Sequence, residues 1–275
     1  DGILNQYAKV NSRVIEAMKK CKVIVRYGIG VDTIDVAAAT KAGIPVCNVP
    51  LYGIHEVSDH VIALLFSCIR KLLPMNAMVK KNSWDYKFSR PIARIQGKSI
   101  GFIGFGNIPK MISKKLKPWD LFMLTCDPFV TKKICEEFGV KKVSLDLLLK
   151  ECDYISLHAP LTPETRYLFN YEKFRSMKQG AIFINTARGA IVDEHGLYKA
   201  MQEGWLAGAG LDVLDKEPPL AQNPLFDLEN IILTPHMAWH SADSEVDLQR
   251  MAAEEVMRVL RGDKPLSCLN SEVLA

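Results

Sequence analysis

From residue 99 onward, short apolar runs alternate with stretches in which apolar residues recur at helical spacing. Runs of this length, each followed by an amphipathic stretch, predict β-α-β units that build a parallel sheet covered by helices on both faces. Six such runs predict a doubly wound α/β domain of the Rossmann type. The predicted strands span residues 99–104, 121–126, 153–157, 181–185, 209–213 and 231–233, and the predicted helices span residues 110–117, 131–138, 145–150, 171–176 and 194–203.

A second and smaller α/β pattern precedes this one. Two stretches with helical spacing, residues 12–19 and 33–42, alternate with apolar runs at residues 23–26 and 46–49. We expect this unit to be truncated at its N-terminal side, because the chain opens without Met and enters an apolar segment at once. The sequence is therefore interpreted as a fragment.

Three other segments complete the predicted organisation. Apolar residues at helical spacing predict one long, buried helix over residues 55–73, which bridges the two domains or packs against a second subunit. Residues 79–96 are polar and aromatic without a clear period and predict an extended arm. A last helical pattern, residues 242–261, returns the chain to the first unit. The predicted domains are residues 1–50 plus 241–275 and residues 51–240.

The composition, 48% hydrophobic and 24% charged, is typical of a soluble globular protein. The formal net charge of +4 is spread over lysine pairs rather than a stripe, which argues against nucleic acid as a partner. The seven cysteines lack the close spacing of metal sites or redox motifs, so we expect reduced thiols, no bound metal and a cytoplasmic protein. Because no apolar run reaches the ~18 residues of a membrane helix, we expect no membrane partner.

A glycine-rich loop follows the first strand of the larger pattern. Gly104 and Gly106 stand where the apolar run gives way to a helix. Glycine lets the backbone turn tightly and approach a pyrophosphate, whose charge is then held by amides at the helix N-terminus. The amides of Asn107 and Ile108 are placed for this role, whereas Pro109 replaces the third glycine of the full fingerprint. Two glycines alone are also typical of an ordinary turn.

Asp127 makes the cofactor interpretation stronger. It ends the next predicted strand 21 residues after Gly106, near the spacing of ~20 residues expected for the acid that binds the adenosine ribose hydroxyls. A carboxylate at this position repels a 2′-phosphate, so the sequence favours NAD over NADP. The alternative is that Asp127 is an exposed turn residue.

Reactive side chains follow three other predicted strands. Arg188 comes after one strand, Asp212 and Glu217 lie at and beyond the end of the next, and His236 follows the last. The carboxyl ends of parallel strands meet at one edge of the sheet, where open α/β sheets bind ligands. Each residue alone would fit an ordinary surface or loop position, but their joint order indicates one catalytic site.

These segments together resemble the D-isomer-specific 2-hydroxyacid dehydrogenase family through nearly the whole chain. The nearest branch is that of the C-terminal binding proteins and the phosphoglycerate dehydrogenase-like proteins. The resemblance implies a flavodoxin-like substrate domain beside the Rossmann domain. Its motifs are residues 26–35 (Arg-Tyr-Gly-Ile-Gly-Val-Asp-Thr-Ile-Asp), the glycine loop, 156–162 (Ser-Leu-His-Ala-Pro-Leu-Thr), 184–194 (Ile-Asn-Thr-Ala-Arg-Gly-Ala-Ile-Val-Asp-Glu), 210–219 (Gly-Leu-Asp-Val-Leu-Asp-Lys-Glu-Pro-Pro) and 232–241 (Ile-Leu-Thr-Pro-His-Met-Ala-Trp-His-Ser).

The resemblance implies a role for each member of the catalytic set. Arg188 would hold the substrate carboxylate and polarise the carbonyl, for which a planar, permanently charged group is suited. His236 would exchange a proton with the carbonyl oxygen, because imidazole accepts and releases protons near neutral pH. Glu217 would bind and orient His236. The substrate pair would be a 2-hydroxy acid and a 2-keto acid.

The resemblance also implies the binding residues. Asp212 would hold the nicotinamide carboxamide, and backbone amides of Ile29 and Gly30 would bind the substrate carboxylate. Trp239 would line the substrate side chain, although packing is the more common role of such a residue. The remaining cofactor contacts would come from His158, Thr162, Thr186 and Ala187.

Two functions stay open at this point. One is an NAD-dependent oxidoreductase that acts on D-2-hydroxy acids. The other is an NAD(H)-regulated, corepressor-like binding protein of the C-terminal binding protein kind with vestigial catalysis. The intact catalytic set favours the enzyme, whereas Pro109 favours the alternative. Two further departures from the family pattern are Asp120, where glycine is usual, and Gly210, where alanine is common. The resemblance also implies a homodimer.

Overall fold

The computed structural model describes residues 1–274, which form two compact units. Within the described residues, the smaller unit comprises Asp1–Gly53 and residues 239–274, and the larger unit comprises Ile54–Ala238. These bounds lie beside the predicted boundaries at residues 50 and 241. The assignment of the smaller unit as the substrate domain stays a prediction.

The larger unit is built on one parallel sheet, which confirms the predicted α/β class. Its strand order, β10-β9-β8-β7-β4-β5-β6, reverses direction beside β4, as in doubly wound folds. The predicted runs all form strands, and β6 is an addition because its three residues include two lysines and show no apolar pattern. The strands are β4 (Ser99–Ile103), β5 (Phe122–Cys126), β6 (Val140–Lys142), β7 (Tyr154–Leu157), β8 (Ala181–Asn185), β9 (Leu206–Leu211) and β10 (Ile231–Leu233).

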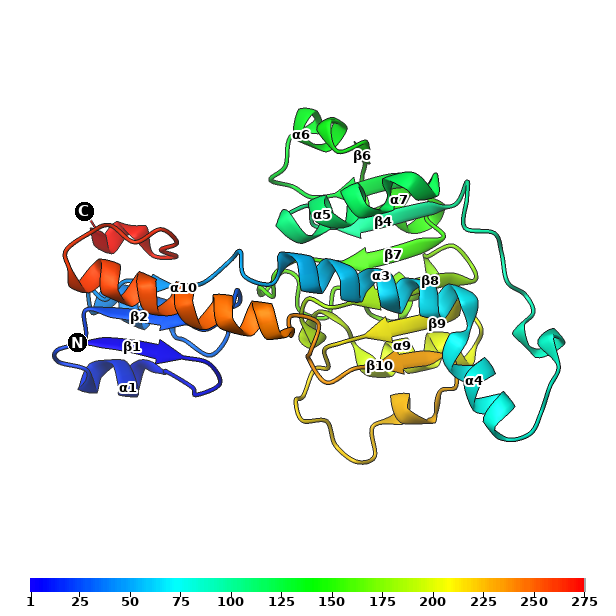
Figure 1. The fold of residues 1–275 in the computed structure, drawn as a ribbon, viewed down its shortest axis with the longest axis horizontal. Helices are drawn as coiled ribbons and strands as arrows, with labels where there is room; N and C mark the ends of the chain where they lie inside the picture. Colours follow the sequence, from blue (N-terminus) through cyan, green and yellow to red (C-terminus); the bar gives the residue numbers. More distant parts are fainter. Residues whose placement is uncertain (275) are drawn as a thin grey trace. The chain divides into compact units, whose positions relative to one another are not determined.

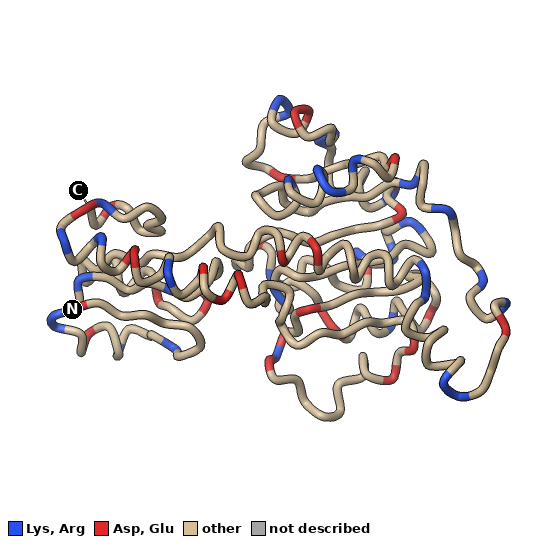
Figure 2. Tube along the Cα trace, in the orientation of Figure 1, with Lys and Arg blue, Asp and Glu red and all other residues tan. Residues whose placement is uncertain are grey.

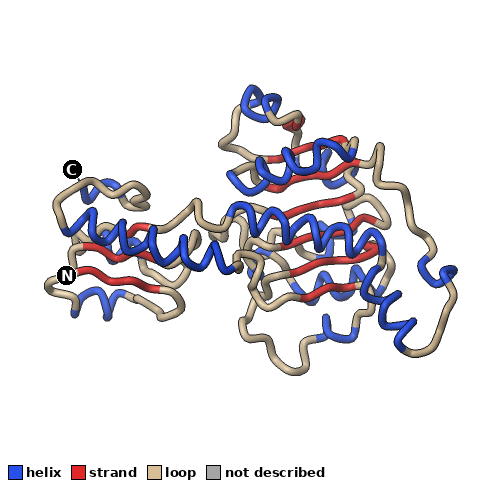
Figure 3. The backbone as a smooth tube through the Cα atoms, viewed as in Figure 1, coloured by secondary structure: helices blue, strands red, loops and turns tan. Residues whose placement is uncertain are grey.

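Helices cover both faces of this sheet (Figures 1 and 3). Successive side chains of a strand point to opposite faces. A Cβ added at Gly210 of β9 would meet Leu64 at 3.0 Å on one face, whereas Ala209 and Leu211 belong to the core cluster on the other. Gly210 therefore allows the close approach of a helix where alanine is common in the family. The helices are α3 (Ile54–Arg70), α5 (Asn107–Leu116), α6 (Lys132–Glu137), α7 (Leu145–Glu151), α8 (Tyr171–Arg175) and α9 (Glu194–Gln202).

The segment after α3 differs from the prediction of one continuous helix over residues 55–73. Lys71 adopts a left-handed conformation with φ 52°, and a second helix, α4 (Leu72–Lys80), begins behind it. The predicted arm at residues 79–96 accordingly starts inside α4 and holds a short turn, η1 (Tyr86–Ser89). Among the described residues no single helix is long and apolar enough to cross a membrane, and only α3 with α4, bent by 59°, meets that test together by length and composition.

Asp120 shows how the chain replaces a glycine. It caps the short turn η2 (Lys117–Trp119) in the left-handed conformation, with φ 54°. Asp tolerates this region better than most residues. Its carboxylate accepts a hydrogen bond of 2.9 Å from Gln96 Nε2, and its carbonyl oxygen accepts one from the amide of Gly97.

The smaller unit contains a three-stranded parallel sheet in the order β1-β2-β3. Ile24 of β2 packs in a cluster with Ile15 and Ala39, whereas Val23 and Val25 pack in a second cluster with residues of the last long helix. The strand β1 was not predicted, because four residues at the chain start show no alternation. The elements are β1 (Gly2–Asn5), α1 (Ser12–Ala17), β2 (Val23–Arg26), α2 (Val36–Lys41), β3 (Val46–Cys47), α10 (Ala242–Leu260) and η5 (Ser271–Leu274).

Charged residues and cysteines follow the expected distribution. Lysine and arginine are interspersed with acidic residues in each unit (Figure 2). All seven cysteines are free thiols. The prediction that nucleic acid is not a partner stays a prediction.

Candidate active site

Three neighbouring strands bring the predicted catalytic residues to one edge of the larger unit's sheet. The strands β8, β9 and β10 are parallel neighbours, so their carboxyl ends meet at the same edge. Arg188 and Asp212 follow the first two strands, and His236 follows the third. The structure therefore places these residues on adjacent loops.

A buried asparagine shapes the loop that carries Arg188. Asn185, 1% exposed, ends β8. Its Oδ1 accepts a 2.9 Å hydrogen bond from the amide of Ala187, and its Nδ2 donates a 3.0 Å bond to the carbonyl oxygen of Arg188. The Arg188 guanidinium donates to the carbonyl oxygen of Ala187 at 2.6 Å. Sequence reasoning did not single out Asn185, although asparagine at a strand end often binds the backbone two residues on.

Gly189 lets the loop that carries Glu217 approach Arg188. A Cβ at this position would lie 1.9 Å from the carbonyl carbon of Leu214 and 2.4 Å from the amide nitrogen of Asp215. Contacts this short with backbone atoms cannot be relieved by a side-chain rotation. Glycine is therefore required for the two loops to pack directly on one another.

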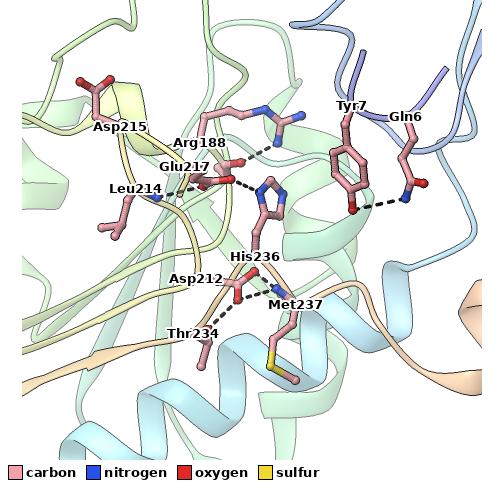
Figure 4. A network of polar contacts seen from close by, with 12 residues as sticks. Gln6, Tyr7, Arg188, Asp212, Leu214, Asp215, Glu217, Thr234, His236 and Met237 are labelled. Atoms are coloured by element: carbon pink, nitrogen blue, oxygen red, sulfur yellow. Dashed lines mark hydrogen bonds and ion pairs between the residues drawn. The ribbon is translucent and has the colours of Figure 1, made fainter. Parts of the chain in front are cut away.

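Glu217 and His236 form the pair that the sequence predicted (Figure 4). Glu217 Oε2 lies 2.6 Å from His236 Nδ1, and Glu217 Oε1 accepts a 3.0 Å bond from the amide of Leu214. Both side chains are partly open, with exposed fractions of 38% and 42%. Because an ionised carboxylate only accepts hydrogen bonds, Nδ1 carries the proton and Nε2 is the ring atom left for proton exchange.

The surroundings of Glu217 favour its ionised form. Burial alone would raise the pKa of this carboxyl. The hydrogen bond from His236, the charge of His236, the amide of Leu214 and the charge of Arg188 outweigh burial and lower the pKa below the usual glutamate value. The carboxylate is therefore present whenever His236 needs a partner at neutral pH.

Asp212 holds the loop on which His236 lies. It is 1% exposed. Its Oδ1 accepts bonds from Thr234 Oγ1 at 2.6 Å and from the amide of Met237 at 2.9 Å, and its Oδ2 accepts one from the amide of Ala238 at 2.9 Å. Its backbone carbonyl accepts from the amide of His236. Asp212 thus fixes this loop, and its Oδ2 retains one lone pair for the cofactor contact that the resemblance implies.

The glycine loop has the geometry of an anion site. Gly104 has φ 90°, and a Cβ there would meet backbone atoms of His158 and Ala159 at 3.1 Å. Gly106 begins α5 as its N-cap residue, without a side-chain cap, and a Cβ at this position would meet nothing within 4 Å. The helix starts at Asn107 rather than at the predicted residue 110. Space and backbone donors therefore coincide at this helix terminus.

Pro109 is the third residue of α5 and is buried. The first four amides of a helix have no partner within the helix, so proline at this position breaks no helical hydrogen bond. The first such bond runs from the amide of Lys110 to the carbonyl oxygen of Gly106. The amides of Asn107 and Ile108 remain available to an anion.

Asp127 follows β5 and ties the glycine loop to its neighbour. Its Oδ2 accepts a 2.7 Å bond from the amide of Phe105, and its Oδ1 accepts bonds from the amides of Phe129 and Val130 at 2.7 and 3.0 Å. The residue is half-buried. The turn interpretation and the cofactor interpretation are thus both compatible with this carboxylate, since it has lone pairs beyond these three bonds.

The segment after β7 borders the glycine loop. His158 Nε2 lies 2.8 Å from Ser156 Oγ, and burial lowers the pKa of His158 to about 3. The ring is therefore neutral at physiological pH. Thr162 forms a local turn, in which its amide donates to Thr165 Oγ1 at 2.7 Å. Near the end of β8, Thr186 Oγ1 is buried without a hydrogen-bond partner among the described residues.

These observations test whether NAD fits the larger unit. Among the described residues, no side chain caps the N-terminus of α5, and no atom lies within 4 Å of a Cβ placed at Gly106. The buried hydroxyl of Thr186 has no hydrogen-bond partner among them either. Buried polar groups are normally paired in proteins, and an uncapped helix terminus attracts anions, so these features after β4 and β8 of one sheet indicate a ligand. The residues present therefore fit a dinucleotide.

The predicted substrate residues Ile29, Gly30 and Trp239 belong to the smaller unit. Asn48 Nδ2 donates a 2.7 Å bond to the carbonyl oxygen of Ile29, which fixes the loop after β2 that contains Ile29 and Gly30. Trp239 packs edge-on against Tyr52, with ring centroids 6.0 Å apart. Packing is thus one role of Trp239, and its contact with substrate stays a prediction.

The described residues hold no metal-ligand cluster, and a surface cleft among them lies apart from the catalytic set. No group of three or more His, Cys, Asp or Glu residues in residues 1–274 could hold a metal ion. The cleft of about 960 Å³ beside the C-terminal end of α5 is lined by residues such as Lys117 and Phe138, and by none of the catalytic set.

The fold and the glycine loop define a dinucleotide-binding domain, and comparisons with known proteins place it in a family. Residues 62–238 match the model of the D-isomer specific 2-hydroxyacid dehydrogenase NAD binding domain. The chain belongs to this family, and its larger unit is an NAD-binding domain of that type. The family and the cofactor predicted from the sequence are confirmed.

Three proteins illustrate the likeness. A D-3-phosphoglycerate dehydrogenase of Archaeoglobus fulgidus is 39% identical over 94% of this chain and 49% of its own length. A glyoxylate reductase of Korarchaeum cryptofilum is 36% identical over 96% of this chain and 81% of its own length. The structure of a D-lactate dehydrogenase of Aquifex aeolicus, complexed with NAD and lactic acid, is 30% identical with a TM-score of 0.87, over 95% of this chain and 83% of that one. The chain thus spans about half the length of the first relative.

Proposed function

We propose that this chain interconverts a D-2-hydroxy acid and its 2-keto acid with NAD(H). The observation that carries the proposal is the 2.6 Å contact between Glu217 Oε2 and His236 Nδ1, next to the charge of Arg188. A paired histidine with one free ring nitrogen is suited to proton exchange, and an arginine beside it is suited to a carboxylate. The family membership and the names of the relatives support the same reaction.

Each residue contributes one step in this proposal. Arg188 binds the substrate carboxylate and draws electron density from the neighbouring carbonyl oxygen. His236 Nε2 donates a proton to that oxygen during reduction and recovers it during oxidation, while Glu217 holds the ring through Nδ1. When bound, NADH would supply the hydride to the carbonyl carbon. In the smaller unit, the amides of Ile29 and Gly30 bind the substrate carboxylate, and Trp239 contacts its side chain.

The remaining cofactor contacts are proposals of the same kind. Gly104, Gly106 and the amides of Asn107 and Ile108 would hold the pyrophosphate. Asp127 would bind the adenosine ribose and disfavour a 2′-phosphate, which gives NAD rather than NADP. The other contacts would be those of His158, Thr162, Thr186, Ala187 and Asp212.

An assay of binding followed by turnover tests the function. NADH binding is measured by quenching of protein fluorescence, and NADH oxidation is then measured with glyoxylate and pyruvate, and NAD reduction with D-3-phosphoglycerate. We expect binding and turnover of at least one compound. Binding without turnover of any 2-keto or D-2-hydroxy acid would contradict the enzyme and favour the corepressor-like alternative. A Glu229→Gln variant, changed at an exposed loop position, controls for handling.

We also propose a homodimer formed through α3, α4 and the arm behind them. Helix α4 has no buried residue, and its Leu72 and Leu73 are 53% and 48% exposed. Further along, Trp84 and Tyr86 are 88% and 70% exposed. Large apolar side chains gathered on one segment are typical of a subunit interface. Sedimentation of the wild-type chain and of Trp84→Ser tests this: a dimer that weakens in the variant is expected, and a monomeric wild-type chain would contradict it.

We also propose a cytoplasmic location. All seven cysteines are free thiols, and free thiols are typical of proteins in the reducing cytoplasm.

A further inference from the structure

His60 lies within α3 and contacts the loop after β10. Its Nε2 lies 3.0 Å from Thr234 Oγ1 and 3.6 Å from Asp212 Oδ1. The His60 side chain is 19% exposed and Asp212 is 1% exposed. A histidine thus connects a core helix to the network that holds the loop of His236.

The direction of these hydrogen bonds follows from the chemistry of the three groups. Asp212, as a carboxylate, only accepts, so the Thr234 hydroxyl must donate its single proton across the 2.6 Å contact to Asp212 Oδ1. Thr234 Oγ1 can then only accept from His60. His60 Nε2 therefore carries a proton and donates it, and the chain of bonds runs from His60 through Thr234 to Asp212.

The loop at the end of this chain of bonds requires support. His236 has a positive φ of 51°, a left-handed conformation that is uncommon for residues other than glycine, although histidine adopts it more often than most. Such a conformation persists only where surrounding bonds enforce it. Here the amides of Met237 and Ala238 donate to the Asp212 carboxylate, and the amide of His236 donates to the Asp212 carbonyl oxygen.

We infer that His60 is a positioning residue for the proposed reaction: by donating to Thr234 it fixes the hydroxyl that orients Asp212, and Asp212 in turn fixes the loop that presents His236. This inference rests on the proposed function for its effect on catalysis. Its effect on the loop itself does not depend on turnover. His60 touches neither His236 nor Glu217 in the hydrogen bonds of the described residues, so it acts through Thr234 and Asp212.

Kinetics of three variants test the inference. His60→Leu removes the donor, and His60→Gln supplies an amide N–H donor instead. His55→Leu changes an exposed histidine of the same helix and is the matched control. We expect His60→Leu to lower kcat about tenfold, since small displacements of catalytic groups reduce rates strongly. NADH affinity should stay within about threefold, because the pyrophosphate loop is not touched. His60→Gln should recover most of the rate.

The link through Thr234 is tested by a double-mutant cycle. Thr234→Val removes the hydroxyl and keeps the shape of the side chain. If His60 acts through Thr234, the double variant is no slower than the slower single variant, because residues that act in one chain of bonds are not additive. Additive losses in kcat would contradict the route through Thr234.

Amide hydrogen exchange gives a readout that is independent of turnover. In His60→Leu the amides of Met237 and Ala238 should exchange about tenfold faster, whereas the amide of Phe105, which donates to Asp127, should be unchanged. Unchanged exchange at Met237 and Ala238, or a His60→Gln variant as slow as His60→Leu, would overturn the inference. An inactive wild-type chain whose His60→Leu variant still shows faster exchange would overturn the proposed function and leave His60 its role in the loop.

Discussion

Two regions at the same edge of the sheet, the loops after β9 and β10 and the loop after β4, differ in whether their polar groups are paired within the protein. After β9 and β10 the polar groups bond to one another: the Asp212 carboxylate accepts from Thr234 Oγ1 and from two backbone amides, and Glu217 pairs with His236. After β4 the helix α5 begins at Gly106 without a side-chain cap. The first region holds the proposed proton-exchanging pair in fixed geometry, and the second leaves the amides of Asn107 and Ile108 available to the proposed ligand. This difference agrees with the proposed function, in which a catalytic group must be positioned by internal bonds and an anion must find unpaired donors.

The histidines of the two regions, His236 and His158, differ in exposure and in hydrogen-bond partner. His236 is 42% exposed and pairs with a carboxylate. His158, beside the glycine loop, is held by Ser156, and burial lowers its pKa to about 3. A neutral ring beside a cofactor contributes shape and a hydrogen bond rather than charge. The proton exchange proposed for His236 is therefore not a role that the neutral, buried ring of His158 can share at physiological pH.

The largest effect is expected from a substitution that disrupts the Glu217–His236 pair. Glu217→Gln removes the negative charge beside His236 and should lower kcat about 100-fold, or about 2.7 kcal/mol, with NADH affinity unchanged. In the wild type the pKa of Glu217 is lowered, so the carboxylate persists as the pH falls and is lost only when the pH passes below that lowered value. Steady-state kinetics from pH 8 to below the usual glutamate pKa of about 4.3 measure both effects. A variant with wild-type kcat would show that the pair is not used.

The next effect concerns stability near the glycine loop. Because the pKa of His158 is lowered to about 3, the unfolded chain binds a proton below pH ~6.5 that the folded chain does not bind. Stability should therefore fall as the pH is lowered from about 6.5 towards 3, by about 2 kcal/mol between pH 6.5 and pH 5. Urea unfolding of the wild type and of His158→Gln measures this difference. Equal pH dependence in both chains would argue against a neutral, buried His158.

A smaller effect tests the open region directly. Gly106→Ala places a Cβ where nothing lies within 4 Å, and its φ of −79° is allowed to alanine. Stability should be unchanged, while NADH affinity should fall about tenfold, because the added methyl group occupies the space of the pyrophosphate. Gly180→Ala, at an open glycine with φ 78°, is the contrasting control and should lose stability without affecting NADH. NADH binding unaffected at Gly106 would remove the pyrophosphate from this loop.

The smallest expected effect comes from Pro109. Pro109→Gly restores a third amide donor at the N-terminus of α5 and should tighten NADH binding about two- to threefold. The gain is limited, because proline already breaks no helical hydrogen bond at this position. Fluorescence titration measures the change. Weaker binding would mean that the buried proline ring stabilises the loop more than the extra donor helps.

Much of the larger unit could be predicted from the sequence, for reasons specific to its elements. Buried parallel strands produce apolar runs, and the turn between β4 and α5 needs glycine at Gly104, where φ is 90°, so both leave a local signal. Strand β6 and the helix break at Lys71 leave no such signal in the sequence. A three-residue edge strand has no period, and a left-handed lysine is not marked by its neighbours in the chain.

Site residues could be predicted where each lies in a recognisable local motif, and not where a residue's role depends on partners far away in the chain. Arg188, Glu217 and His236 could be proposed from the sequence because each lies in a motif that follows its own predicted strand. The roles of Asn185 and His60 were not found, since their bonds depend on loop geometry and on a helix 174 residues away from Thr234. The full set of bonds to Asp212 was hidden for the same reason. No sequence pattern records such packing.

The most direct test separates the two regions in one variant. His236→Gln removes the proton-exchanging ring and leaves the glycine loop untouched. NADH binding and the rate of NADH oxidation with a saturating 2-keto acid are measured on the same preparation. We expect an NADH dissociation constant within about twofold of wild type and a kcat at least ~100-fold lower. An unchanged kcat, or a loss of NADH affinity that accounts for the loss of turnover, would contradict it.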